Sequence, residues 1–150
     1  MGNHDTRPIW ARVAEWEAHG KIRDRAAYLA RRLAPREEVD ALRARIAGDR
    51  GTMVQAYFAD LLVSDAQNVI VFFADLFGTE ETYNAPGTVG PENWSLRVPP
   101  DYQERYRRDA GDLRALNIAY ACSLAMGSPL AEDAPRELGQ HLQRMARRSA

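Results

Sequence analysis

Cysteine is almost absent from this chain, since Cys122 is the only one. An internal disulfide is therefore excluded, and a zinc site built from cysteine thiolates is not expected. Cys122 falls in the helical run 113–126, and a lone cysteine in such a run is typically a small core residue. We therefore predict a structural role for Cys122.

The chain also lacks an excess of charge of either sign and a long apolar run. Its formal net charge is -1, so no overall field attracts nucleic acid or an anionic membrane. No apolar run approaches the roughly 20 residues of a membrane-spanning helix, and the N-terminus has no hydrophobic signal core. The histidines at 4, 19 and 141 show no metal-ligand spacing. We expect a cytoplasmic protein with no metal, no nucleic-acid partner and no membrane partner.

What the sequence does contain is a helical pattern. Its 150 residues suffice for one domain with a hydrophobic core, and neither a repeat nor a linker divides the single region 1–150. Apolar residues recur at helical spacing between proline and glycine boundaries. The predicted helices cover residues 8–20, 22–33, 35–48, 53–62, 101–108, 113–127 and 135–145.

One segment has the pattern of a strand. Residues 69–73 (VIVFF) are apolar on both faces, which is typical of a parallel strand buried on both sides. The backbone of a buried strand needs hydrogen-bonding neighbours. We therefore predict a mainly α fold with one or two parallel strands, in which further strands are hidden or belong to a part of the protein outside this chain.

A long loop follows the predicted strand and is the strongest candidate for a binding site. Pro86 fixes φ and Gly87 permits a sharp bend, so the loop can hold its shape in solvent. Asn84 and Asn93 offer donors and acceptors that suit neutral, hydroxyl-rich ligands. Trp94 has two interpretations: a platform for a sugar ring, or a plug under the loop.

Other side chains could also contribute to a sugar site. Tyr83 and Trp10 could stack on sugar faces, and the His4–Asp5 pair could hold hydroxyl groups, bind a metal or orient a base. Glycosidic chemistry uses two carboxylates, about 5–5.5 Å apart when configuration is retained. The carboxylates near the loop are Asp75, Glu80, Glu81 and Glu92. Spacing assigns no pair among them, and Asp75 also fits a cap for a short turn.

Together these residues resemble the C-terminal part of 4-α-glucanotransferases, the amylomaltases or disproportionating enzymes. The family pattern is a His-Asp pair, a long helical stretch, a strand ending in Asp-Leu-Leu-Gly, then Asn-x-Pro-Gly-Thr and Asn-Trp. The matching segments are residues 3–6 (NHDT), 75–78 (DLFG), 84–88 (NAPGT) and 93–97 (NWSLR). Ala74 and Phe77 stand where the family often has Gln and Leu.

The resemblance implies a fold. It is the C-terminal fragment of a (β/α)₈ TIM barrel, made of the last strand–helix units with inserted helices. Asp5 would follow the seventh strand, and residues 68–73 would form the eighth. The active site of such a barrel lies at the C-terminal ends of its strands.

The resemblance also implies an activity: transfer of α-1,4-glucan segments between maltodextrin or glycogen chains by a retaining double displacement. The family needs no cofactor. Asp5 matches the catalytic carboxylate that stabilises the transition state by binding and distorting the sugar. The substrate-binding residues implied in the same way are His4, Asn84, Pro86, Gly87 and Trp94.

The nucleophile and the acid/base Glu of the family lie upstream of the His-Asp pair, and this chain begins at Met1, shortly before His4. We therefore expect the chain alone to be inactive, and an N-terminal half of the same enzyme is a candidate partner. The alternative interpretation is a non-catalytic, small helical protein that binds glucan or a partner.

Overall fold

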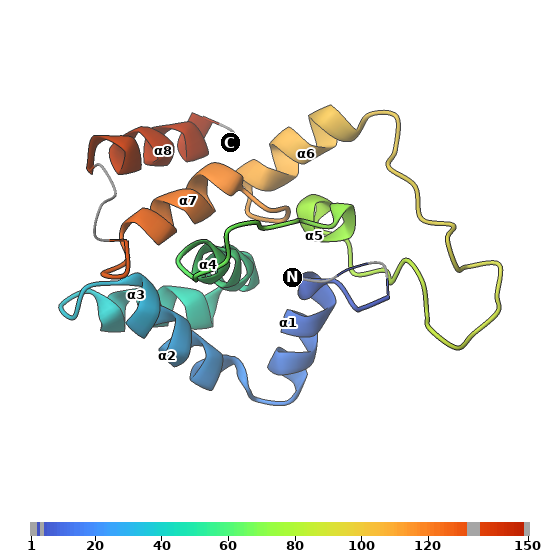
Figure 1. Cartoon of the computed structure of the whole chain (residues 1–150), viewed down its shortest axis with the longest axis horizontal. Coiled ribbons are helices and arrows are strands. Elements are labelled where there is room, and N and C mark those ends of the chain that lie inside the picture. The colour runs from blue at the N-terminus through green and yellow to red at the C-terminus, as the bar shows by residue number, and fades with distance from the viewer. Residues whose placement is uncertain (1–2, 4, 132–135, 149–150) are drawn as a thin grey trace.

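The fold is an assembly of helices around one central helix. The computed structural model describes residues 3, 5–131 and 136–148, and this part of the chain contains helices and no strand. The helices are α1 (Ile9–Ala18), α2 (Ile22–Leu33), α3 (Val39–Gly48), α4 (Arg50–Leu62), α5 (Phe73–Phe77), α6 (Tyr102–Gly111), α7 (Ile118–Met126) and α8 (Arg136–Arg148). In Figure 1, α1–α3 lie on one side of α4, and α6–α8 lie on the other. None of the described helices has both the length and the apolar character needed to cross a membrane.

Helix α4 is central because it is apolar around most of its circumference, as expected for a helix surrounded by others. Met53, Val54, Ala56 and Ala59 are completely buried on it, and α1, α2, α3 and α7 all pack against it. The helix begins where the Asp49 carboxylate accepts a hydrogen bond from the Thr52 backbone N–H at 2.6 Å. Such an N-cap satisfies a backbone donor that would otherwise lack a partner.

The surrounding helices bury the apolar faces that their spacing predicts. Ile9 and Val13 of α1, Leu29 of α2 and Ile46 of α3 belong to one continuous core. The helix predicted over 113–127 is shorter in the structure. It begins only at Ile118, because the Asn117 side chain caps α7 by accepting from the Tyr120 N–H at 3.0 Å.

The predicted strand is wrong. Residues 68–72 belong to no helix, and in the described part of the chain they form no β-ladder. Val69 and Val71 pack against the helical core, whereas Ile70 is 88% exposed, and Phe73 already begins α5. Only one face of the segment is covered, by helices, and no neighbouring strand satisfies its backbone. The described residues are therefore all-helical, and the predicted TIM-barrel fragment with parallel strands is not observed.

A buried glutamine connects α4 to the segment before α7. Gln55 is fully buried; its Nε2 donates to the Ala115 carbonyl at 3.1 Å, and its Oε1 accepts from the Asn117 N–H at 2.9 Å. The same segment contacts α5, since the Leu116 N–H donates to the Leu76 carbonyl at 3.0 Å. Gln55 thus satisfies two buried backbone groups that have left regular helix.

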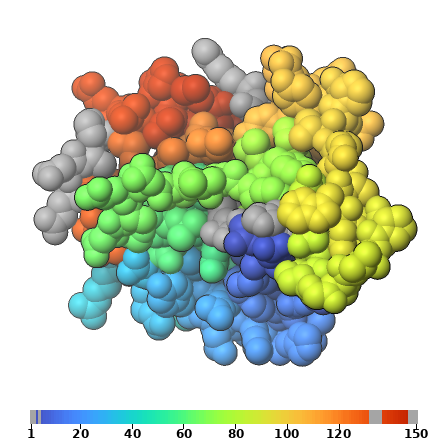
Figure 2. Space-filling model, turned by 45° about the vertical axis from the view of Figure 1, so that its right-hand side comes forward, coloured from blue at the N-terminus to red at the C-terminus, as the bar shows by residue number. Residues whose placement is uncertain are grey.

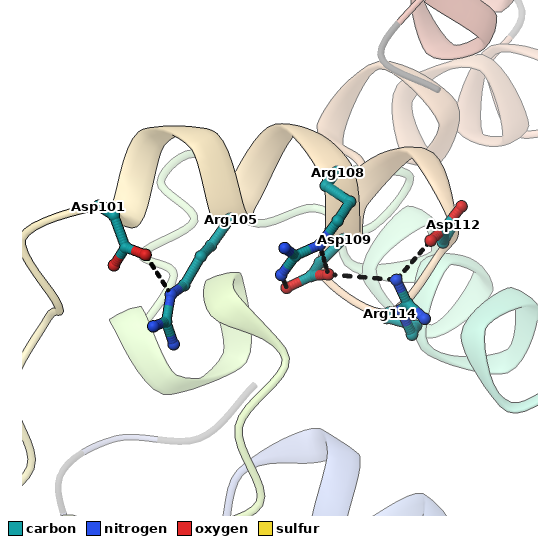
Figure 3. A network of polar contacts seen from close by, with 6 residues as sticks. All are labelled: Asp101, Arg105, Arg108, Asp109, Asp112 and Arg114. Carbon is teal, nitrogen blue, oxygen red and sulfur yellow. Dashed lines mark hydrogen bonds and ion pairs between the residues drawn. The ribbon is translucent and has the colours of Figure 1, made fainter.

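Ion pairs follow α6 into the α6–α7 connection (Figure 3). The Arg105 guanidinium donates to Asp101 at 2.7 Å, and Arg108 donates to Asp109 at 3.0 Å. Arg114, from the connection, reaches the same Asp109 carboxylate at 3.4 Å. The hydrogen bond from Arg105 lowers the pKa of Asp101, and the hydrogen bond from Arg108 lowers the pKa of Asp109.

Candidate functional site

The structure brings Asp5 and Asn84 together. The Asn84 Nδ2 donates to the Asp5 Oδ1 at 2.6 Å, across a separation of 79 residues in the chain. Figure 1 shows the N-terminal segment running beside the start of the long loop that follows α5, and Figure 2 shows blue N-terminal residues against the yellow-green loop. Asp5 is exposed and Asn84 is half-buried. The pair therefore lies at the surface, where a ligand can reach it.

A local turn positions Asp5. The Asn3 side chain accepts from the Asp5 N–H at 2.9 Å, and the Asn3 carbonyl accepts from the Thr6 N–H at 3.2 Å. The Thr6 hydroxyl in turn accepts from the Asn3 N–H at 2.8 Å. Asparagine and threonine favour such side-chain turns. His4, predicted to bind substrate, lies outside the described residues.

Asn93 holds the loop in shape. Its Oδ1 accepts from the Ala85 N–H at 3.0 Å, and its Nδ2 donates to the Thr88 carbonyl at 3.1 Å and to the Thr88 hydroxyl at 3.0 Å. The Asn93 side chain, near the end of the loop, thus supports the loop backbone in place of a neighbouring strand or helix. The sequence favours Asn93 as a ligand contact, whereas in the structure its amide bonds other residues of the loop.

Pro86 and Gly87 form the tip of a turn between Ala85 and Thr88. The Thr88 N–H donates to the Ala85 carbonyl at 3.2 Å, and Gly87 has φ of 78°. Proline followed by glycine at positive φ is the pattern of a type II turn. Both residues are exposed, so they can shape a wall beside Asn84 but offer little chemistry of their own.

Trp94 is a half-exposed platform. Its side chain is 49% exposed, and its ring meets the ring of Tyr83 edge-on, with centroids 5.1 Å apart. The Trp94 N–H donates to the Tyr83 carbonyl at 2.9 Å, and its φ is 61°, in the left-handed region that a bulky residue rarely adopts. The half-exposed ring favours a platform over a buried plug.

The aromatic residues around the site have unequal roles. Tyr83 packs edge-on against Phe72 and Phe73 as well as Trp94, so it supports the platform. Trp10 is buried, and its indole N–H donates to the Asp75 carbonyl at 2.8 Å. Trp10 is therefore a core residue, and its predicted stacking on sugar is wrong.

Two of the carboxylates near the loop, Asp75 and Glu80, have structural partners. Asp75 is completely buried and accepts from the Ile9 N–H at 2.6 Å, while Glu80 pairs with Arg50 at 2.8 Å. In the part of the chain that the structure describes, no group of three or more His, Cys, Asp or Glu residues could hold a metal ion.

Cys122 is half-buried on α7, and burial raises the pKa of its thiol.

No protein-family profile, curated protein or solved structure matches this chain.

Proposed function

We propose that this chain is part of a 4-α-glucanotransferase and holds α-1,4-glucan, the polymer of maltodextrin and glycogen, at a surface formed by Asp5, Asn84 and Trp94. The observation that carries the proposal is the 2.6 Å hydrogen bond from Asn84 to Asp5. It joins the two segments 3–6 and 84–88, which carry much of the resemblance to that family.

The chemistry of the three side chains suits a neutral sugar. The Asp5 carboxylate accepts hydrogen bonds from hydroxyl groups. Asn84 has a second N–H and a carbonyl oxygen that no described residue engages, so it can both donate to and accept from a sugar. The half-exposed ring of Trp94 offers an apolar face of the kind that packs on pyranose rings.

Transfer of glucan needs two further groups. In the family a carboxylate nucleophile forms a glucosyl-enzyme, and an acid/base Glu protonates the leaving oxygen. The resemblance places both groups upstream of the His4–Asp5 pair. We therefore propose that the chain alone binds glucan without cleaving it, and that an N-terminal half of the same enzyme supplies both groups, in the cytoplasm.

Calorimetric titration with maltoheptaose tests the binding. We expect saturable heat from the intact chain and a loss of affinity of about tenfold in Asn84→Ala, because the variant removes one pair of hydrogen bonds to the sugar and releases Asp5. Asn68→Ala, at an exposed position before α5, is the matched control and should bind like the intact chain. Equal affinity of Asn84→Ala and Asn68→Ala would refute the site.

Incubation with maltotriose tests the absence of catalysis. We expect neither glucose nor longer maltodextrins from the chain alone, and both products when an N-terminal half carrying the nucleophile and acid/base is added. Clear disproportionation by the chain alone would contradict the proposal.

A second candidate is a non-catalytic, helical glucan-binding protein. It is favoured by the core, because the described helices bury Ile9, Leu29, Ile46 and Met53 against one another. This candidate predicts a cooperatively melting monomer whose maltoheptaose affinity does not change when an N-terminal half is added. The transferase proposal predicts tighter binding in the reconstituted enzyme.

A further inference from the structure

A cavity lies away from Asp5 and Asn84. It has a volume of about 470 Å³ and lies where the end of α3, the α6–α7 connection, α7 and α8 meet. Volumes of this order are typical of sites for small molecules. No residue of the proposed glucan surface lines it, so a ligand bound there would not contact that surface.

One end of this cavity is cationic and rich in donors. Arg45, at the end of α3, donates a hydrogen bond to the Tyr120 hydroxyl oxygen. A guanidinium has five N–H donors and remains charged at any ordinary pH, so Arg45 keeps donors for a ligand. No described residue accepts the hydrogen of the Tyr120 hydroxyl, which leaves that hydroxyl able to donate as well.

Tyr120 stays protonated at neutral pH. Burial raises the pKa of Tyr120, and the nearby positive charge of Arg45 only partly offsets this effect. The negative charge of Asp49 also raises the pKa of Tyr120. The Asp49 carboxylate is already engaged as the cap of α4, where it accepts from the Thr52 N–H at 2.6 Å. Among the described residues, the cavity lining itself contains no carboxylate.

The other walls are mainly apolar. Leu113, Leu124 and Ala146 line them, and Ser123 and Gln143 add neutral polar groups. Leu113 adopts φ of 56°, a left-handed conformation that is rare for a branched residue. Backbone outliers of this kind concentrate at ligand sites. The cavity thus combines one charged, donor-rich end with an apolar body.

We propose that this cavity binds a small organic anion, a carboxylate or a phosphate ester with a compact apolar body. The anionic group would contact the Arg45 guanidinium and the Tyr120 hydroxyl, and the body would pack against Leu113 and Leu124. Charge-assisted hydrogen bonds of this type are about twice as strong as neutral ones, so the anionic group dominates recognition.

Amide-resolved NMR titration of the full chain tests this site with three probes: phenyl phosphate, benzoate and neutral phenol. We expect saturable shifts at α7, around Tyr120 and Ser123, with at least one of the two anions. Phenol should bind more weakly, and the anion that binds more tightly identifies the class as phosphate ester or carboxylate.

Two variants of α3 make the test specific. Arg45→Gln should weaken anion binding by about tenfold or more. Arg43→Gln is the matched control, because Arg43 is exposed on the same helix and pairs with Asp40 at 3.0 Å. The Arg43→Gln variant should bind the anion with the affinity of the intact chain. The proposal is overturned if neither anion gives saturable shifts at α7, if phenol binds equally well, or if Arg45→Gln binds like Arg43→Gln.

Discussion

The carboxylate of Asp75 caps helix α1, although Asp75 itself belongs to α5. Its Oδ1 accepts from the Ile9 N–H at 2.6 Å, and its backbone carbonyl accepts from the Trp10 indole at 2.8 Å. Pro8, which directly precedes α1, provides no side-chain cap. The Asp75 side chain thus satisfies one of the backbone N–H groups left open at the start of a helix, and this contact ties the N-terminal helix to α5 and the start of the loop.

Replacement of Asp75 should destabilise the fold. Asp75→Ala removes the acceptor of a buried backbone N–H, and we expect a loss of about 2–3 kcal/mol in the free energy of unfolding. Urea denaturation followed by circular dichroism measures it. Glu81→Ala, at an exposed position outside the core, should change that free energy by less than about 0.5 kcal/mol. Similar losses in both variants would show that the cap has no specific role.

Gln55→Leu should cost about 3 kcal/mol. The variant leaves the Ala115 carbonyl and the Asn117 N–H buried without their partner, and each unsatisfied group costs about 1–3 kcal/mol. Thermal and urea unfolding give the value. Gln103→Leu, on the exposed face of α6, is the matched control and should be nearly neutral. A loss below about 1 kcal/mol for Gln55→Leu would mean that water or a shifted backbone replaces the glutamine.

Two glycines with similar backbone geometry should respond differently to alanine. Gly78 has φ of 77°, and an added Cβ would collide with the Arg114 carbonyl, whereas Gly20 has φ of 67° and open space around the same position. Gly20→Ala should therefore cost only the conformational penalty of about 1–2 kcal/mol. Gly78→Ala should cost clearly more, because α5 must move away from the α6–α7 connection. Equal losses in the two unfolding free energies would contradict this packing.

Asp109 should contribute to acid sensitivity. The hydrogen bond from Arg108 lowers the pKa of Asp109 in the folded state. The ionised Asp109 therefore stabilises the fold fully at pH values above the ordinary Asp pKa of about 4. This stabilisation is lost as the pH falls through the lower pKa of the folded state. Asp109→Asn should therefore lower the free energy of unfolding at pH 7 by about 1 kcal/mol or less, since the Arg108 side chain is 60% exposed and solvent screens the pair. The gap from the intact chain should close at lower pH. Glu37→Gln, at an exposed position outside this network, serves as the control, and a gap that persists or widens toward low pH would contradict the assignment.

Most of the helices could be predicted from the sequence, because apolar spacing and Pro or Gly boundaries are local signals. The strand at 69–73 could not be excluded in this way. An apolar run indicates that a segment packs against a core. It does not indicate whether the neighbouring elements in that core are strands or helices. Here Val69 and Val71 meet helices, and Ile70 faces solvent.

The site was only partly predictable. Spacing alone does not connect Asp5 to Asn84; the resemblance implied that they line one pocket, and they form a hydrogen bond in the structure. The burial of Trp10 and the cap formed by Asp75 had no local signal, because both depend on a contact between residues more than 60 positions apart. The role of Asn93 in holding the loop was weakly indicated by its residue type, since asparagine side chains commonly form hydrogen bonds with loop backbone.

Asp5, Asn84 and Trp94 are proposed to form one glucan-binding surface. The most direct test is an amide-resolved NMR titration of the chain with maltoheptaose, repeated with cellohexaose as a control for the linkage. We expect saturable shifts concentrated in residues 5–6 and 83–95 with maltoheptaose, and none with cellohexaose. Absence of saturable shifts in these two segments, or shifts of the same size with both glucans, would contradict the proposed surface.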